Sequence, residues 1–119
     1  MSLRSATPVL RVSDYAAARA FWRDVLGFTV TEEAGDPVKG FGIFRRDGAR
    51  VFLIAWNGPE ASYDHWRAYF DTDDLDGIVS ALDAADAAYR GPVLTEYGMR
   101  EVEIADPDGN VVCFGQDGS

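Results

Sequence analysis

The sequence predicts an α+β protein of two tandem βαβββ modules, whose strands form a cupped mixed sheet with the helices outside. Two observations lead to this prediction. The order of strand, helix cap and amphipathic helix occurs twice, and the copies superimpose at an offset of about 60 residues. Each half also contains a turn of aspartate and glycine, Asp47-Gly48 and Asp108-Gly109. Because each half is too small to bury its own sheet face, we expect one domain over residues 1–119.

The first module is predicted over residues 5–58. It begins with a strand over residues 7–12, and Ser13-Asp14 then caps a helix that Gly27 ends. One face of this helix is apolar at Ala18, Phe21, Trp22, Val25 and Leu26. The remaining strands are predicted over residues 28–33, 41–46 and 50–56, with a polar loop over residues 33–40.

A linker over residues 57–63 leads to the second module, predicted over residues 64–117. A strand over residues 65–72 precedes a helix that starts at Asp73-Asp74. The apolar face of this helix is made by Leu75, Ile78, Val79 and Leu82. Gly91-Pro92 is predicted to break the chain before a short strand over residues 93–96. The module ends in a hairpin from Glu101 to Phe114, which turns at Pro107-Asp108-Gly109-Asn110.

Composition narrows the classes of function. The 47% hydrophobic and 13% aromatic content is typical of a packed globular protein. No apolar run approaches the about 20 residues that span a bilayer, and the start lacks a secretory signal pattern, so we expect a cytoplasmic protein with no membrane partner. The net charge of −9 argues against nucleic acid and fits a cationic or neutral small ligand, or serves solubility alone. A single cysteine, Cys113, excludes an internal disulfide.

Strand alternation predicts which side chains line the concave face. The set in the first module is Thr7, Val9, Arg11, Phe52, Ile54 and Trp56. The set in the second module is His65, Arg67, Tyr69, Asp71 and Cys113. By the same alternation, we expect Trp66, Ala68 and Phe70 to face the core.

Three stretches resemble the glyoxalase/bleomycin-resistance (vicinal oxygen chelate) superfamily. They are residues 7–14, residues 21–28, and residues 101–114 with their Asp106-Pro107-Asp108-Gly109-Asn110 core. The helix at Ala20-Phe21-Trp22, the stretch Gly91-Pro92-Val93-Leu94-Thr95-Glu96 and the final hairpin are most similar to the bleomycin-resistance branch. The resemblance implies paired βαβββ modules and a homodimer with pockets between modules. In some members the N-terminal strand is exchanged, and Pro8 lies where that exchange would be hinged.

Metal-dependent members of that superfamily carry histidine or glutamate ligands at positions that match Thr7, Phe52, Arg67 and Cys113. Arginine and phenylalanine are not ligands for a divalent cation, so we expect no metal and no other cofactor. The lone histidine, His65, is more simply a strand-end residue. Cys113 is expected to be a small wall or core residue rather than a nucleophile, because no basic partner is evident.

The resemblance to the bleomycin-resistance branch implies that the protein sequesters a drug-like small molecule and so confers antibiotic resistance. A cationic aromatic glycopeptide is one candidate, since aromatic faces stack planar rings and acidic groups attract cations. The predicted ligand contacts are Phe41, Phe44, Phe52, Trp56, Arg67, Tyr69, Tyr97, Glu103 and Cys113. For Phe44 and Phe52 a place in the sheet core is the alternative.

Two features favour other ligands and other functions. The loop before the last hairpin is shorter than in the branch's closest members and offers only Tyr97, and Arg67 would oppose a cation, so a different planar or anionic ligand is an alternative. No catalytic residue is predicted. The rival function is an enzyme of the same superfamily, such as a lyase, isomerase or thiol transferase acting on a small metabolite. Its acid–base groups would be Glu103, Asp71 and Tyr69. A third possibility is a domain whose main role is to form a dimer interface.

Overall fold

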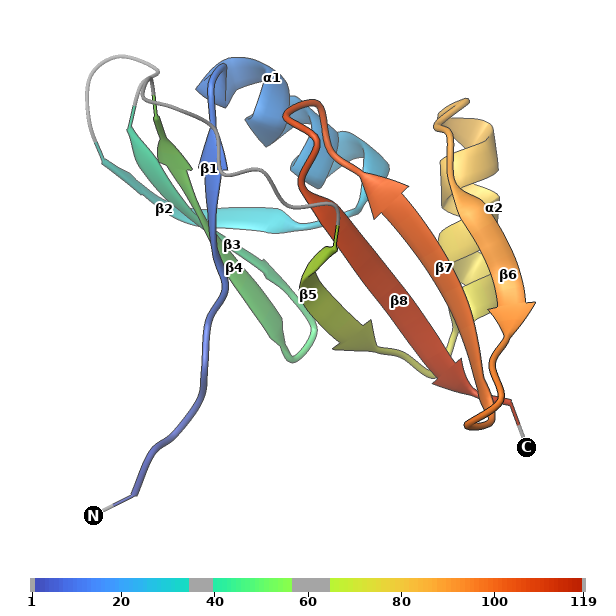
Figure 1. Ribbon diagram of the computed structural model, residues 1–119. Coiled ribbons are helices and arrows are strands. Elements are labelled where there is room, and N and C mark those ends of the chain that lie inside the picture. The colour runs from blue at the N-terminus through green and yellow to red at the C-terminus, as the bar shows by residue number, and fades with distance from the viewer. Residues whose placement is uncertain (1, 35–39, 57–64, 119) are drawn as a thin grey trace.

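The computed structural model describes residues 2–34, 40–56 and 65–118, which form two four-stranded mixed sheets (Figure 1). The elements of the first module are β1 (Val9–Val12), α1 (Tyr15–Ala20), η1 (Phe21–Val25), β2 (Thr29–Ala34), β3 (Phe41–Arg46) and β4 (Ala49–Ala55). Those of the second are β5 (Trp66–Asp71), α2 (Leu75–Ala84), β6 (Arg90–Leu94), β7 (Met99–Ala105) and β8 (Val111–Asp117). The predicted α+β class with two βαβββ units is confirmed. The whole of the predicted linker, residues 57–63, and most of the predicted loop lie outside the described residues.

The two sheets have the same strand order. The first runs β1-β4-β3-β2 and the second β5-β8-β7-β6. In each sheet the first strand pairs in parallel with the last, Val9 lying opposite Phe52 and Tyr69 opposite Cys113. A parallel pair cannot be closed by a tight turn, so the helix and the hairpin strands of each module form the crossover between its first and last strands.

The helix starts are the predicted ones. Asp14 caps α1 by accepting a hydrogen bond from the Ala17 amide at 3.1 Å, and Asp74 caps α2 by accepting one from the Gly77 amide at 3.0 Å. The first helix does not stay α-helical to its end, because its last turn, η1, is a wider π-helical turn. Gly27 follows with φ of +75°, as the predicted stop requires.

The predicted break at Gly91-Pro92 is wrong. Both residues lie inside β6, and the pairing of β6 with β7 shifts between Arg90 and Val93. Gly91 has φ of +110°, and a Cβ there would lie 2.5 Å from the Glu101 carbonyl oxygen. Glycine and proline are therefore accommodated as an irregularity of an edge strand, where a missing amide hydrogen costs little.

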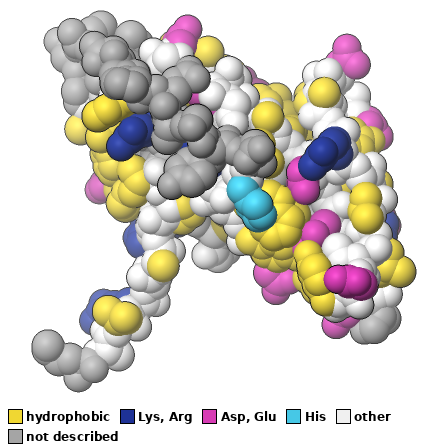
Figure 2. Space-filling model, viewed as in Figure 1, with side chains coloured by type: hydrophobic (Ala, Val, Ile, Leu, Met, Phe, Trp, Pro, Cys, Tyr) yellow, Lys and Arg dark blue, Asp and Glu magenta, His cyan; other side chains and the backbone are white. Residues whose placement is uncertain are grey.

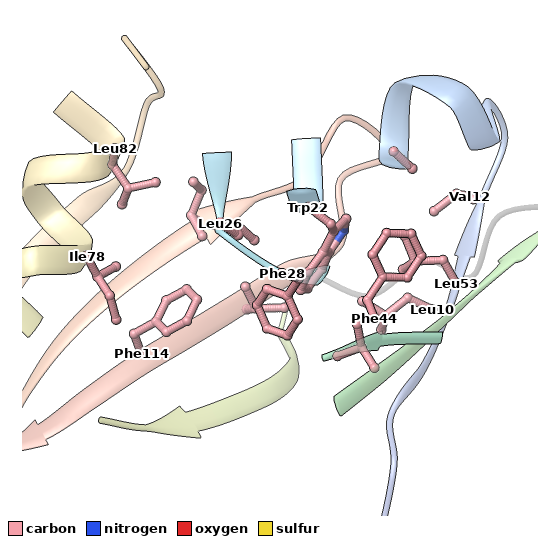
Figure 3. Close-up of a cluster of buried hydrophobic side chains, with 14 of the residues drawn as sticks. Leu10, Val12, Trp22, Leu26, Phe28, Phe44, Leu53, Ile78, Leu82 and Phe114 are labelled. Carbon is pink, nitrogen blue, oxygen red and sulfur yellow. The ribbon is translucent and has the colours of Figure 1, made fainter. Parts of the chain in front are cut away.

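One hydrophobic core is shared by both modules (Figure 3). Trp22 and Phe28 from the first module meet Phe70 of β5 with ring centroids 6.5 and 5.8 Å apart. Phe70 in turn stacks on Phe114 at 5.2 Å. The rings form a continuous apolar path from one sheet to the other, so the modules are expected to unfold together. Among the described residues no helix is long and apolar enough to cross a membrane.

The turn of the last hairpin joins the modules through polar contacts. Asp106 is buried and accepts hydrogen bonds from the Asp108 and Asn110 amides at 2.9 and 2.8 Å. It also accepts one from the indole of Trp22 in the first module at 3.4 Å. Burial raises the pKa of the Asp106 carboxyl, although these hydrogen bonds oppose the rise. The sequence of this motif predicts only a turn, but in the structure the motif also forms a contact between the two modules.

Candidate functional site

Each sheet has one side on the shared core and an opposite side that we call its open face. The first open face carries Val9, Arg11, Phe41, Ile43, Phe52, Ile54 and, just beyond β4, Trp56. The second open face carries Trp66, Tyr69, Glu101, Glu103 and Cys113, with Tyr97 reaching it from the turn before β7. The candidate ligand contacts thus divide into two groups on two different sheets of one chain.

The first open face is aromatic and basic. Phe41 and Phe52 meet edge to face with centroids 5.0 Å apart. The Arg11 guanidinium lies over the Trp56 ring at 4.3 Å, and the Arg50 guanidinium lies 5.4 Å from the Phe52 ring. These rings are therefore already covered in part by cations of the same chain.

The second open face is organised around a buried carboxylate. Glu101 is only 7% exposed, and its Oε2 accepts hydrogen bonds from the Tyr69 hydroxyl at 2.9 Å and the Tyr97 hydroxyl at 2.8 Å. Tyr69 lies on β5, and its side chain extends across β8 to reach Glu101 on β7. Gly115 makes the crossing possible, since a Cβ at this position would lie 1.7 Å from the Tyr69 hydroxyl oxygen.

Both phenols of this cluster are held in their neutral form. Burial and then the hydrogen bond to Glu101 raise the pKa of Tyr69, and the hydrogen bond to Glu101 raises the pKa of Tyr97. Because each hydroxyl proton is donated to a carboxylate, only the oxygen lone pairs and the rings remain available to a ligand.

Glu103 lies two residues further along β7 and has partners of its own. It pairs with Arg90 of β6 and accepts a hydrogen bond from the Trp66 side chain. Although burial opposes the change, these two partners lower the pKa of Glu103. This carboxylate therefore stays ionised and holds the Trp66 indole in place.

Cys113 lies on the same side of its sheet but does not reach the surface. Its exposed fraction is 0%, and burial, reinforced by the nearby Glu101 and Glu103, raises the pKa of its thiol to about 12. A neutral, buried thiol fits the expected wall residue and does not suit a nucleophile.

Two face assignments need correction. Phe44 was predicted to contact ligand, but it is 0% exposed, lies on the core side of β3 and packs edge to face on Tyr15. Trp66 was predicted to face the core, but the pairing of β5 with β8 shifts between Trp66 and Ala68. This bulge at Arg67 places Trp66 on the open face, where its ring meets Tyr69.

Sequence reasoning missed two residues of the second open face. Glu101 could have been found, because it alternates with Val102 and so shares a face with Glu103. Trp66 could not, since no local sequence signal marks the bulge. Among the predicted contacts, the structure places Phe41, Phe52 and Trp56 on the first open face and Tyr69, Tyr97 and Glu103 on the second. Arg67 stands in the bulge itself.

The positions that match metal ligands in the superfamily do not suit a metal ion. They hold Thr7, whose hydroxyl accepts a hydrogen bond from Arg50 at 2.8 Å, together with Phe52, Arg67 and the buried neutral thiol of Cys113. No group of three histidine, cysteine or carboxylate side chains that could hold a metal occurs within the described ranges. The donor chemistry at these positions therefore disagrees with the metal site of the enzymes.

A separate cavity of about 500 Å³ lies between the modules. Its apolar lining comes from both modules and includes Phe28, Phe70, Ile78 and Phe114. The N-terminal arm borders it through Ala6 and Pro8. The cavity therefore borders the second open face at Tyr69 and the first at Arg50, and it lies where the arm leaves the body of the protein.

The surface of the second open face combines apolar and acidic groups. Figure 2 shows hydrophobic and acidic side chains side by side around the single histidine, His65, whose ring lies 5.1 Å from that of Trp66.

Two repeated modules with aromatic open faces define a class of small paired-module proteins that contains both binders and enzymes. The chain belongs to the Glyoxalase/Bleomycin resistance protein/Dioxygenase superfamily, whose family model matches residues 4–114.

Solved structures with this fold include proteins of different activities. An antibiotic-binding protein, TnmS3 from Streptomyces sp. CB03234, is 27% identical with a TM-score of 0.75, covering 98% of this chain and 99% of that one. A bleomycin resistance determinant encoded on transposon Tn5 is 22% identical with a TM-score of 0.82, covering 97% and 98%. Lactoylglutathione lyase from Agrobacterium tumefaciens is 22% identical with a TM-score of 0.73, covering 95% and 92%. No curated protein matches the chain.

Proposed function

We propose that this protein is a metal-free binding protein that sequesters a drug-like small molecule. The observation that carries the proposal is the pair of exposed aromatic open faces, combined with phenylalanine, arginine and a buried thiol at the positions where the superfamily's enzymes hold a metal. A cationic aromatic glycopeptide such as bleomycin is the first ligand to test, and antibiotic resistance is the corresponding biological role. Similarity to proteins named for antibiotic and bleomycin binding supports this choice.

The proposed pocket is completed by a second copy of the chain. Each open face is a single wall with exposed apolar side chains, including Val9 at 55% and Tyr97 at 63%, which are typical of surfaces that bind a partner or ligand. The first open face is rich in arginine and the second contains Glu101 and Glu103, so unlike faces of two copies are complementary in charge. A homodimer that pairs them would enclose a ligand between two aromatic walls.

The N-terminal arm fits an exchange between the two copies. Residues 2–8 extend away from both sheets (Figure 1). The arm is held by Arg50, which donates to Thr7 at 2.8 Å and to Ser5 at 3.0 Å, and by the Phe52 amide, which donates to the Pro8 carbonyl at 3.0 Å. An arm that packs little on its own chain is free to pack on a neighbour.

Two of the three candidate acid–base groups of the rival enzyme, Tyr69 and Glu103, are engaged in the fold. The Tyr69 proton is donated to Glu101, and Glu103 is held by Arg90 and Trp66. Neither group carries the poised, near-neutral pKa that general acid–base catalysis favours. The arrangement therefore supports binding better than proton transfer.

Titration calorimetry with bleomycin, on protein treated with a chelator and dialysed, tests the proposal. We expect binding at one site per chain, unchanged by the chelator, and a dimer by light scattering. Binding that requires added nickel, zinc, manganese or iron would contradict the metal-free pocket. An absence of heat and of thermal shift with bleomycin and with a panel of planar aromatic drugs would contradict the sequestering role.

A further inference from the structure

Three aromatic side chains on the second open face are arranged at angles to each other. The Trp66 and Tyr69 rings have centroids 5.3 Å apart and planes inclined at 53°. The Tyr97 and Tyr69 hydroxyls donate to the same oxygen of Glu101, so the third ring is anchored to the same carboxylate as Tyr69. The inclined rings of Trp66 and Tyr69 differ from the parallel rings that would clamp a flat molecule.

Each of these rings is fixed by a carboxylate behind it. Glu101 holds both tyrosines, and Glu103 holds the indole of Trp66. The rings are thus oriented before any ligand arrives, which lowers the entropic cost of binding. The polar hydrogens that could serve a ligand are already donated to the carboxylates, so the surface presents π faces, lone pairs and negative charge.

The charged groups around these rings include cations as well as anions. Arg90 pairs with Glu103, and Arg67 stands in the bulge beside Trp66. The only arginine–ring pairs within the described residues are those of Arg11 with Trp56 and Arg50 with Phe52, both on the first open face. The tryptophan of the first open face is therefore covered by a cation of the chain, whereas no such pair involves Trp66 or Tyr69 within the part of the chain that the structure describes.

The geometry points to an aromatic cage on the second open face, formed by Trp66, Tyr69 and Tyr97, that binds an alkylated ammonium group of the ligand. Rings with negative charge behind them attract a cation through the ring quadrupole, and a methylated nitrogen needs no hydrogen-bond acceptor. A primary ammonium would instead require direct access to a carboxylate, and Glu101 is buried behind the rings. This inference rests on the proposed ligand-binding role of the second open face and names the ligand group that it recognises.

Choline and its uncharged isostere 3,3-dimethylbutan-1-ol are the probes that test the cage. The indole Nε1–H resonances of Trp22, Trp56 and Trp66 can be followed by NMR in nitrogen-15-labelled protein, with Trp66→Phe providing the assignment. We expect choline to shift the Trp66 signal saturably, with an affinity about fivefold above that of the alcohol, and to leave the Trp56 signal in place. Equal affinities, a shift at Trp56 instead of Trp66, or no shift would overturn the inference.

Variants separate the cage from general effects on folding. Tyr97→Leu removes a ring that is 63% exposed, so the fold should persist while choline binding weakens at least threefold. Glu101→Gln should reduce the advantage of choline over the alcohol. The matched control is Asp83→Asn, which alters another tyrosine–carboxylate pair, with Tyr89 at 2.6 Å, on helix α2. Preference for choline that survives both Tyr97→Leu and Glu101→Gln would also overturn the inference.

The choline experiment and the drug-binding experiment can fail separately. If planar drugs bind and choline does not, the sequestering role stands and the cage is wrong. If choline binds with the expected preference and no drug binds, the cage stands and the proposed drug ligand is wrong.

Discussion

The side-chain amide of Asn110 donates a hydrogen bond to the carbonyl oxygen of Arg11 at 2.9 Å, across the boundary between the two modules. Asn110 is 5% exposed and also donates to Asp106 at 3.0 Å. The final turn therefore holds the strand whose Arg11 side chain covers Trp56. A change in the turn of the second module is expected to reach the first open face.

Asn110→Ala should lower the free energy of unfolding by about 1–3 kcal/mol, because it leaves the buried Asp106 carboxylate and the part-buried Arg11 carbonyl without this donor. Urea denaturation followed by tryptophan fluorescence measures the loss. The matched control is Asp47→Asn in the corresponding turn of the first module, where the side chain is 92% exposed and asparagine also tolerates the φ of +52°, and we expect a change within about 0.5 kcal/mol. Similar stabilities of the two variants would contradict the role given to Asn110.

Asp106→Asn should cost stability in a way that depends on pH. Burial raises the native pKa of Asp106 above its ordinary value, so this group's contribution to stability is fully present below that ordinary value and is lost as pH rises through the native pKa. Asparagine does not titrate. We therefore expect the stability difference between the wild type and Asp106→Asn to grow as the pH is lowered from neutral. A difference that shrinks towards acid would show that the hydrogen bonds outweigh burial.

Gly115→Ala should displace Tyr69 from Glu101, since the new Cβ would lie 1.7 Å from the hydroxyl oxygen. We expect a destabilisation of about 1–3 kcal/mol and a fall in the pKa of Tyr69, read by ultraviolet titration of the tyrosines. Gly48→Ala is the control, because no heavy atom lies within 4 Å of the Cβ it would add. An unchanged tyrosine titration in Gly115→Ala would contradict the crossing of Tyr69 over β8.

Trp56→Ala should weaken binding of an aromatic drug at the first open face. The exposed ring is 40% accessible, and its loss should reduce the affinity for bleomycin about 3- to 30-fold in calorimetry. Leu94→Ala is the control, since Leu94 is a comparably exposed apolar residue but lies opposite Arg100, which reaches back to Asp76 on α2. An equal loss of affinity in both variants would argue against a specific role for Trp56.

Cys113 should resist alkylation in the native protein. Its pKa of about 12 leaves little thiolate at pH 8, and the side chain has no exposed surface. We expect modification by iodoacetamide more than about a hundredfold slower in native protein than in urea. Rapid native modification, at a rate that rises through pH 8, would instead indicate an accessible and activated thiol.

The fold could be predicted from the sequence because short stretches of residues specify where its helices begin and end. Asp14 and Asp74 cap helices and Gly27 ends one through backbone geometry that a short window of residues specifies. The two units also repeat, so each supports the reading of the other. The interior of β6 was misjudged because Gly91-Pro92 is tolerated there by its edge position, and edge position is set by the whole sheet.

The residues of the open faces could be predicted from the sequence only where side chains alternate regularly along a strand. Phe41 and Phe44 are three residues apart in one strand and so lie on opposite faces, which excludes one of them from a shared site. Beyond the bulge at Arg67, alternation alone misplaced Trp66. The burial of Glu101 depends on Tyr69 and Tyr97 from other segments, and contacts between distant segments carry no local signal.

The absence of a side chain at position 115 also restricts how this protein can evolve. Every single-nucleotide change that converts a glycine codon to that of another amino acid adds at least a Cβ, and here that atom would collide with Tyr69. Any single substitution at position 115 would therefore disturb the tyrosine-lined surface through a steric clash, although glycine itself contributes no side chain to that surface. Directed evolution towards new ligands should therefore accumulate changes at positions such as 97 and leave 115 unchanged.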